Sequence, residues 1–178
     1  MTKRLEDRWR RRRNESSHQE GPATTQVTIS EQVTVTGVAA DRLWRLVWDP
    51  ATSPLVFDHV VSGFTLPGTP AGKVGEMQMQ VVAGPGGTLV GMIDEVVELG
   101  PGYRAVTRSR STAVSSTSTT VILPLAQGGC VLRHSTDMTV NADTADDVLE
   151  QTQVHTRRYL ARIRELAETS ERHRPNQR

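Results

Sequence analysis

Three side chains that can exchange protons or hydrogen bonds fall on two predicted elements. His134 lies on a predicted strand at 129–140, and His155 and Tyr159 lie on a predicted long helix at 144–168. Residues four apart share one side of a helix, so His155 and Tyr159 can meet one another. A histidine titrates near neutral pH and a phenol can donate a hydrogen bond. The three could therefore bind a carbonyl or phenol group and move a proton.

The apolar pattern indicates which of these side chains point inward. On the last predicted strand, His134 shares its alternating face with Leu132 and Val140, which places it on the inner face. Tyr159 lies within the apolar stripe of the helix, and His155 lies at its edge. Plain structural roles stay open for all three. His134 would then be a core histidine bonded to a neighbouring side chain, and His155 a partly exposed ring beside a packed tyrosine.

Further candidate ligand-binding residues share the predicted inner faces of three strands. They are Tyr103 and Thr107 on 103–110, Met77 and Met79 on 73–83, and Thr136 and Met138 on 129–140. Methionine adapts to irregular ligands, although it fills gaps in a core equally well. The hydroxyl-rich run at 109–120 fits either the polar wall of a cavity or an exposed strand face.

The motifs of several enzyme classes are missing from the sequence. No spacing of cysteine and histidine suits a metal site, and no G-x-S-x-G turn marks a serine hydrolase. The glycine-rich segment 84–87 lacks the pattern of a phosphate-binding loop. Asp94 and Glu95 are adjacent on a strand, so they point to opposite faces and do not form a paired acid/base site. We expect neither a metal nor another cofactor, and the sequence assigns no catalytic residue.

The elements that must position these side chains follow a distinctive order. A strand with alternating apolar residues at 26–36 precedes a short helix that Asp41 caps or opens. This helix is expected to stop at Asp49-Pro50, because a residue before proline avoids the helical conformation. One more helical turn is expected within 51–58. Six strands follow, predicted at 60–66, 73–83, 88–99, 103–110, 113–124 and 129–140. Their short Gly- and Pro-rich connections predict antiparallel hairpins, and the long helix, capped by Asp143 or Thr144, ends the order.

The composition fits one globular domain between two polar ends. The chain of 178 residues is long enough to bury a core, and no stretch approaches the ~20 apolar residues that cross a bilayer. Residues 1–25 are expected to form a disordered basic arm, without a secretory signal, and 169–178 a polar tail. Nucleic acid is not expected as a partner, except through the basic residues of 3–13. Cys130 is the only cysteine, which favours a cytoplasmic location.

Three segments resemble a known superfamily. VTISEQVTVTGVAADRLWRLVWDPATSP at 27–54 resembles its opening strand and apolar helix, GMIDEVVELGPGYRAVTRS at 91–109 its central hairpin, and HTRRYLARIRELAE at 155–168 its terminal helix. The superfamily is the START-like (SRPBCC) superfamily, which includes polyketide cyclases, coenzyme Q-binding proteins and lipid-transfer domains. The resemblance spans 26–168 and implies an α+β helix-grip fold. A curved antiparallel sheet of about seven strands would wrap the long C-terminal helix, with two short helices after the first strand.

The resemblance implies a cavity between sheet and helix for a hydrophobic small molecule. The first hypothesis is binding or transport of a lipid, quinone or polyketide-like compound. The alternative is a polyketide cyclase or dehydratase that uses His134, His155 or Tyr159 as acid and base, without metal or nucleotide. Aromatic cyclases of the family are thought to use an arginine in the cavity, and no inward arginine is predicted here, which weakens the enzyme hypothesis. A third possibility is an interaction module with a basic arm. We expect the protein to be a monomer or a homodimer.

Overall fold

The computed structural model describes residues 23–100, 102–109 and 115–172, so most of the predicted basic arm lies outside the described residues. The predicted elements are all found within a few residues of their expected bounds. In chain order they are β1 (Thr24–Val35), α2 (Ala40–Trp48), the 3-10 turn η1 (Pro50–Thr52), α3 (Ser53–Val56), β2 (Val60–Thr65), β3 (Met77–Ala83), η2 (Pro85–Gly87), β4 (Leu89–Gly100), β5 (Tyr103–Ser109), β6 (Ser115–Pro124), β7 (Cys130–Asn141), η3 (Ala142–Thr144) and α4 (Ala145–Arg172).

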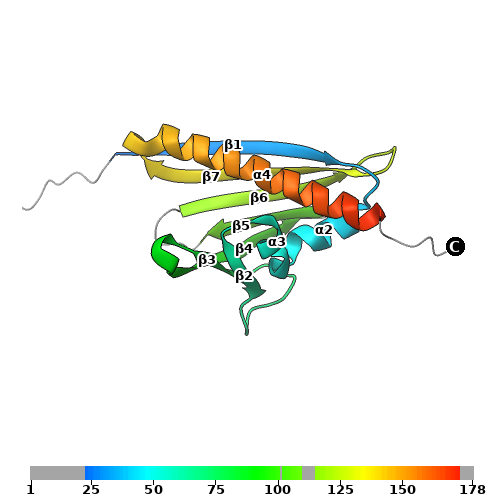
Figure 1. Ribbon diagram of the computed structural model, residues 1–178, viewed down its shortest axis with the longest axis horizontal. Coiled ribbons are helices and arrows are strands. Elements are labelled where there is room, and N and C mark those ends of the chain that lie inside the picture. The colour runs from blue at the N-terminus through cyan, green and yellow to red at the C-terminus, as the bar shows by residue number, and fades with distance from the viewer. Residues whose placement is uncertain (1–22, 101, 110–114, 173–178) are drawn as a thin grey trace, which may run out of the picture.

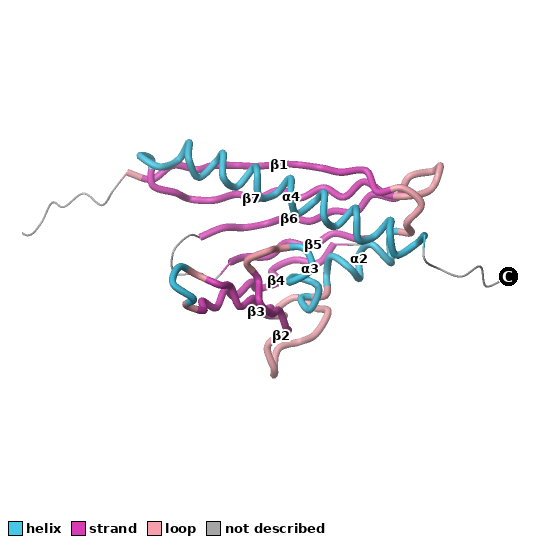
Figure 2. The backbone as a smooth tube through the Cα atoms, viewed as in Figure 1, coloured by secondary structure: helices cyan, strands magenta, loops and turns pink. Residues whose placement is uncertain are grey.

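The seven strands form one antiparallel sheet in the order β1-β7-β6-β5-β4-β3-β2. Strands β2 to β7 run as a meander, and the first strand pairs with the last. Helix α4 lies along the β1–β7 side of the sheet, while α2 and α3 lie beside it towards the other strands (Figures 1 and 2). The predicted α+β helix-grip architecture is therefore confirmed.

The helix boundaries follow from local hydrogen bonding. The Asp49 carboxylate accepts a bond of 2.9 Å from the Ala51 amide, and Pro50 begins the next turn, as expected for a stop at Asp49-Pro50. The prediction that Asp143 or Thr144 caps the last helical segment is wrong. The capping side chain is Asn141, which accepts a bond of 3.0 Å from the Asp143 amide and so starts η3 ahead of α4.

The apolar core is divided into two clusters at opposite ends of α4. The larger cluster packs α2 and the second half of α4 against the sheet; its fully buried members include Val35, Leu43, Ile122, Leu132, Leu160 and Ile163. The smaller cluster joins the first turns of α4 to β1 and β7 through Val27, Ile29, Met138 and Val140. Each cluster is closed by helix on sheet, which fixes the position of α4 along its length.

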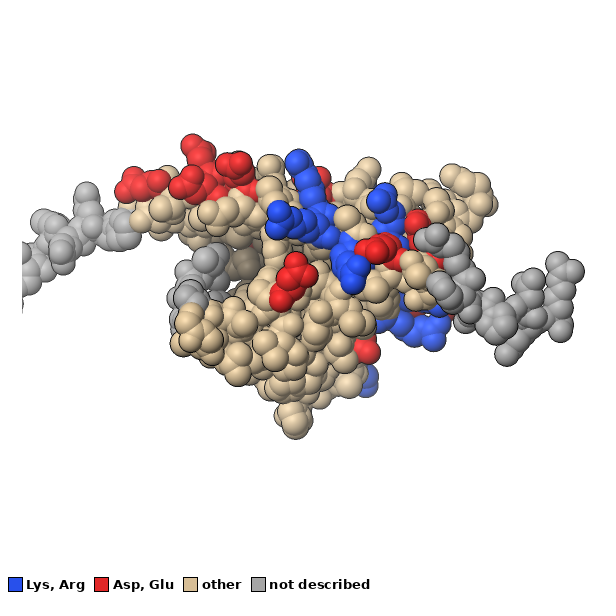
Figure 3. Space-filling model, viewed as in Figure 1, with Lys and Arg blue, Asp and Glu red and all other residues tan. Residues whose placement is uncertain are grey.

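The outward face of α4 is charged. Acidic side chains gather at its beginning and arginines along its middle (Figure 3). Arg157 bonds Glu31 at 2.8 Å, and Arg162 bonds Glu165 at 2.6 Å, so these arginines serve the surface. No helix within the described ranges is long and apolar enough to span a membrane.

One buried carboxylate holds the connection between β2 and β3. Glu76 is 2% exposed. It accepts hydrogen bonds from the Thr65 hydroxyl at 3.1 Å, from the Gln78 amide at 3.0 Å and from the Gly72 backbone N–H. Both carboxylate oxygens are thus engaged within the protein, which is how a buried anion is tolerated.

Candidate ligand-binding cavity

A cavity of about 330 Å³ lies between the inner face of the sheet, the α2–α3 segment and α4. This volume is near the lower end of the roughly 300–1,000 Å³ typical of small-molecule sites. His59 and His155 line it and are exposed, so they mark a mouth of the cavity. The position agrees with the expected space between sheet and C-terminal helix.

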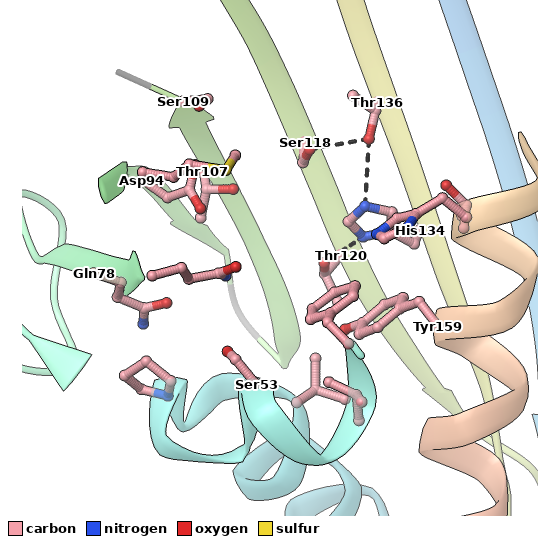
Figure 4. A pocket seen from close by; sticks show the side chains of 18 of the residues that line it. Ser53, Gln78, Asp94, Thr107, Ser109, Ser118, Thr120, His134, Thr136 and Tyr159 are labelled. Carbon is pink, nitrogen blue, oxygen red and sulfur yellow. Dashed lines mark hydrogen bonds between the residues drawn. The ribbon is translucent and has the colours of Figure 1, made fainter. Parts of the chain in front are cut away.

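The cavity has two unlike walls. The sheet contributes mostly hydroxyl, amide and acid side chains, because alternate residues on each strand face the same side: Gln78 and Gln80 on β3, Asp94 on β4, Thr107 and Ser109 on β5, Ser116, Ser118 and Thr120 on β6, and His134 and Thr136 on β7. The helical side contributes mainly apolar and aromatic groups, among them Val47, Trp48, Val56, Phe57, Tyr159 and Ile163. Figure 4 shows Asp94 and Thr107 across the cavity from His134 and Tyr159.

Hydroxyl groups hold both ring nitrogens of His134. Its Nδ1 lies 3.0 Å from the Thr120 hydroxyl and its Nε2 lies 3.3 Å from the Thr136 hydroxyl, which in turn lies 3.0 Å from Ser118 Oγ (Figure 4). Burial, with a smaller contribution from His155, lowers the pKa of His134 to about 4. The imidazole is therefore neutral near pH 7, with one N–H to donate and one nitrogen to accept. The expected core-type hydrogen bonding of His134 is present, on a wall that also faces the cavity.

A group of aromatic rings forms the opposite side. Phe57 stacks on Tyr159 with centroids 4.9 Å apart and on His155 at 5.2 Å. Tyr159 also meets His134 edge-on at 5.6 Å. Burial raises the pKa of Tyr159, so its phenol stays protonated. His155 is only partly shielded from water by the neighbouring rings; this partial desolvation, and after it the nearby His59 and Arg158, lowers its pKa.

Asp94 is the acid on the cavity wall. It lies directly opposite Ser109 in the register of β4 and β5. Burial raises the pKa of Asp94, and the hydrogen bond from Ser109 offsets part of that rise. A carboxyl group shifted in this way and facing a cavity is a typical functional candidate.

Six of the nine residues expected at the ligand site line this cavity: Thr107, His134, Thr136, Met138, His155 and Tyr159. The structure places Tyr103, Met77 and Met79 elsewhere. Tyr103 packs against the larger core cluster, with its ring 6.0 Å from that of Trp44. Whether any of these residues contacts a ligand stays a prediction.

The prediction that Met77 and Met79 lie on the inner face of β3 is wrong. Gln78 and Gln80 line the cavity, while Met79 lies over Gly91 on the other face, where a Cβ on that glycine would come within 3.1 Å of its sulfur. The apolar-in pattern holds for a dry core, and a polar cavity wall inverts it. Gln78 is held in place because its amide also donates to Glu76 and to the Trp48 carbonyl, the latter at 3.3 Å.

The sequence reading missed Asp94, both glutamines and Phe57 as cavity residues. For Asp94 the obstacle was the mixed face pattern of its strand, which the structure explains by a bulge between Val96 and Glu98. The hydroxyl-rich run, by contrast, was a usable signal. Of its two possible roles, the described residues fit the polar wall, since Ser116, Ser118 and Thr120 all face inward.

Comparison with known proteins supports the fold. No protein-family model and no curated protein sequence matches the chain. Among solved structures, the Zhui aromatase/cyclase from Streptomyces sp. R1128 is similar with a TM-score of 0.68 and 17% identity, over 84% of this chain and 98% of that one. Norcoclaurine synthase from Thalictrum flavum, in complex with dopamine and hydroxybenzaldehyde, is similar with a TM-score of 0.62 and 16% identity, over 86% of this chain and 91% of that one. Ara h 8.0201 is similar with a TM-score of 0.64 and 13% identity, over 82% of this chain and 99% of that one.

The resemblance seen in the sequence is thus confirmed at the level of fold. The match covers 91–99% of the lengths of these three structures, so it extends over the whole fold and not over one motif. The chain has the helix-grip fold that the sequence resemblance implied.

Proposed function

We propose that the protein binds an aromatic, oxygen-rich small molecule, such as a quinone or a polyketide-like compound, in the cavity between the sheet and α4. The observation that carries this proposal is the pair of unlike walls. An aromatic ring would pack against Phe57 and Tyr159, and its oxygens would meet the hydroxyls and amides of the sheet. An alkyl lipid chain would cover those polar groups without bonding them, which is costly, so a lipid is the less favoured ligand.

The names of the similar structures are consistent with this ligand class. One is an aromatase/cyclase, and another was solved with dopamine and hydroxybenzaldehyde, both aromatic and oxygen-bearing. At 16% and 17% identity these structures support the fold alone, so the choice of ligand rests on the side chains of this chain.

The test compares two neighbouring residues of β6 that face opposite ways. Ser118 lines the cavity and Thr117 does not. We expect the Ser118→Phe variant to fill the space and lose ligand, and Thr117→Phe to keep it. Native mass spectrometry of freshly purified protein, followed by identification of the extracted compound, measures this. Equal retention by both variants would place the ligand outside the cavity, and a retained alkyl lipid would refute the aromatic class.

A second candidate function is cyclisation or dehydration of a polyketide-like chain. One observation favours it, namely that His134 and Tyr159 face the same cavity. With a pKa of about 4, however, His134 is a weak base near pH 7, and both its nitrogens already meet hydroxyls. Turnover of an aromatic polyketide-like chain that is lost in His134→Gln while binding persists would favour this candidate. The cytoplasmic location, the oligomeric state and a role for the basic arm stay predictions.

A further inference from the structure

The charged groups around the cavity are unevenly distributed. Among the described lining residues there is one carboxyl group, Asp94, and there is neither a lysine nor an arginine. The polar partners on the far side are neutral, since His134 is unprotonated near pH 7 and Tyr159 keeps its proton. The described cavity therefore combines a single acid with a set of uncharged hydrogen-bonding groups.

The surroundings of Asp94 leave it able to bind more than the protein provides. Its partner is Ser109, directly opposite on β5, whose hydroxyl donates one hydrogen bond. A carboxylate can accept about four hydrogen bonds, so the described residues leave most of this capacity for a group in the cavity that Asp94 lines. Figure 4 shows Asp94 beside Thr107 and Ser109 on the wall of the pocket. Removal from water makes an anion at this position costly unless a donor or cation meets it.

We propose that Asp94 is the subsite for a protonated nitrogen of the ligand, so that the cavity selects an aromatic molecule bearing a basic amine. This inference rests on the proposed function and names the substrate class of the same site. The ammonium group would pair with the Asp94 carboxylate while the ring packs against Phe57 and Tyr159. A ligand carboxylate at the same place would face a like charge with no described cation to offset it, so aromatic acids are disfavoured.

The test uses three probes that share a naphthalene ring and differ in one group. They are 2-(1-naphthyl)ethylamine, 2-(1-naphthyl)ethanol and 1-naphthylacetate, and isothermal titration calorimetry at pH 7 gives each dissociation constant. A hydrogen bond to a charged group contributes enough that we expect the amine to bind about 10-fold to 100-fold more tightly than the alcohol. The carboxylate probe should bind more weakly than both.

Two variants locate the effect. Asp94→Asn should remove the charge pairing with the ammonium group and bring the affinity for the amine to within about twofold of that for the alcohol. The control is Asp137→Asn, which removes the same charge from the exposed face of β7, where Asp137 meets Thr28 at 2.6 Å. This control should retain the amine preference.

The outcomes separate this inference from the proposed function. Equal binding of amine and alcohol to the unaltered protein overturns the Asp94 inference and leaves aromatic binding intact. An amine preference that survives Asp94→Asn also overturns it, because another group must then carry the selectivity. Failure of all three probes to bind at millimolar concentration contradicts both the inference and the proposed function.

Discussion

Two carboxyl groups of this protein are removed from water in different ways: several donors of the protein surround one, and the other faces a cavity. Glu76, 2% exposed, is closed off by a hydroxyl, an amide and a backbone N–H. Asp94 faces a cavity and receives a hydrogen bond from Ser109. The carboxylate of Glu76 thus stabilises the connection between β2 and β3, whereas that of Asp94 can accept hydrogen bonds from a group in the cavity. The supply of donors, more than burial itself, distinguishes the two.

The largest expected effect comes from making the same change at both acids. Glu76→Gln places an amide group where donors already point, so we expect a loss of about 3 kcal/mol in the free energy of unfolding. Asp94→Asn should cause no loss near pH 7, because it removes a charge that burial disfavours. Urea denaturation of the two variants measures the contrast. Comparable destabilisation by both would show that Asp94 is a structural acid like Glu76.

A second effect concerns His134, which the cavity wall supplies with two hydroxyl partners. Its pKa of about 4 lies below the ordinary value of 6.5, so the folded state favours the neutral ring. The stability that this contributes is complete above pH 6.5 and is lost as the pH falls towards 4. We expect the free energy of unfolding lost between pH 7.5 and pH 4.5 for this reason to be about 2.5 kcal/mol. His134→Gln should remove this part of the decline when unfolding is measured from pH 7.5 to 4.5. An unchanged decline would mean that His134 titrates normally.

The smallest effect is the pH dependence of Asp94 itself. Its folded pKa is raised above the ordinary 3.8, so the folded state holds the proton more tightly than the unfolded chain. Stability is therefore lost as the pH rises from the unfolded pKa through the folded one. We expect Asp94→Asn to gain stability relative to the unaltered protein over that interval. A saturating amine ligand should reverse the sign of the difference, and thermal unfolding with and without 2-(1-naphthyl)ethylamine measures it.

The sequence predicted the fold better than the site for a physical reason. Strand β7 alternates cleanly because its inner face includes the dry core at Leu132 and Val140. His134 has the same alternation, so its inward direction could be predicted. On β3 the inner face borders the cavity at Gln78 and Gln80, so hydrophobicity pointed the wrong way. Element order and turn residues depend on local sequence and survive such exceptions.

Other features of the site could not be read from a single sequence. Phe57 stacks on Tyr159 only because α3 and α4 meet in space, far apart in the chain. The bulge in β4 between Val96 and Glu98 breaks the alternation of the strand that carries Asp94, so its sequence pattern does not show which face is inward. Neither the stacking of Phe57 on Tyr159 nor the bulge in β4 produces a periodic pattern in the surrounding sequence.

The most direct test of the account is a crystal structure of the protein with 2-(1-naphthyl)ethylamine bound. We predict the naphthalene ring beside Phe57 and Tyr159, with the ammonium nitrogen within hydrogen-bond distance of the Asp94 carboxylate. The structure offers a clear competing position, a second hollow of about 690 Å³ lined by Trp44, Arg45 and Glu76 among others. A probe found there, with the cavity between sheet and α4 occupied by water alone, would contradict the account.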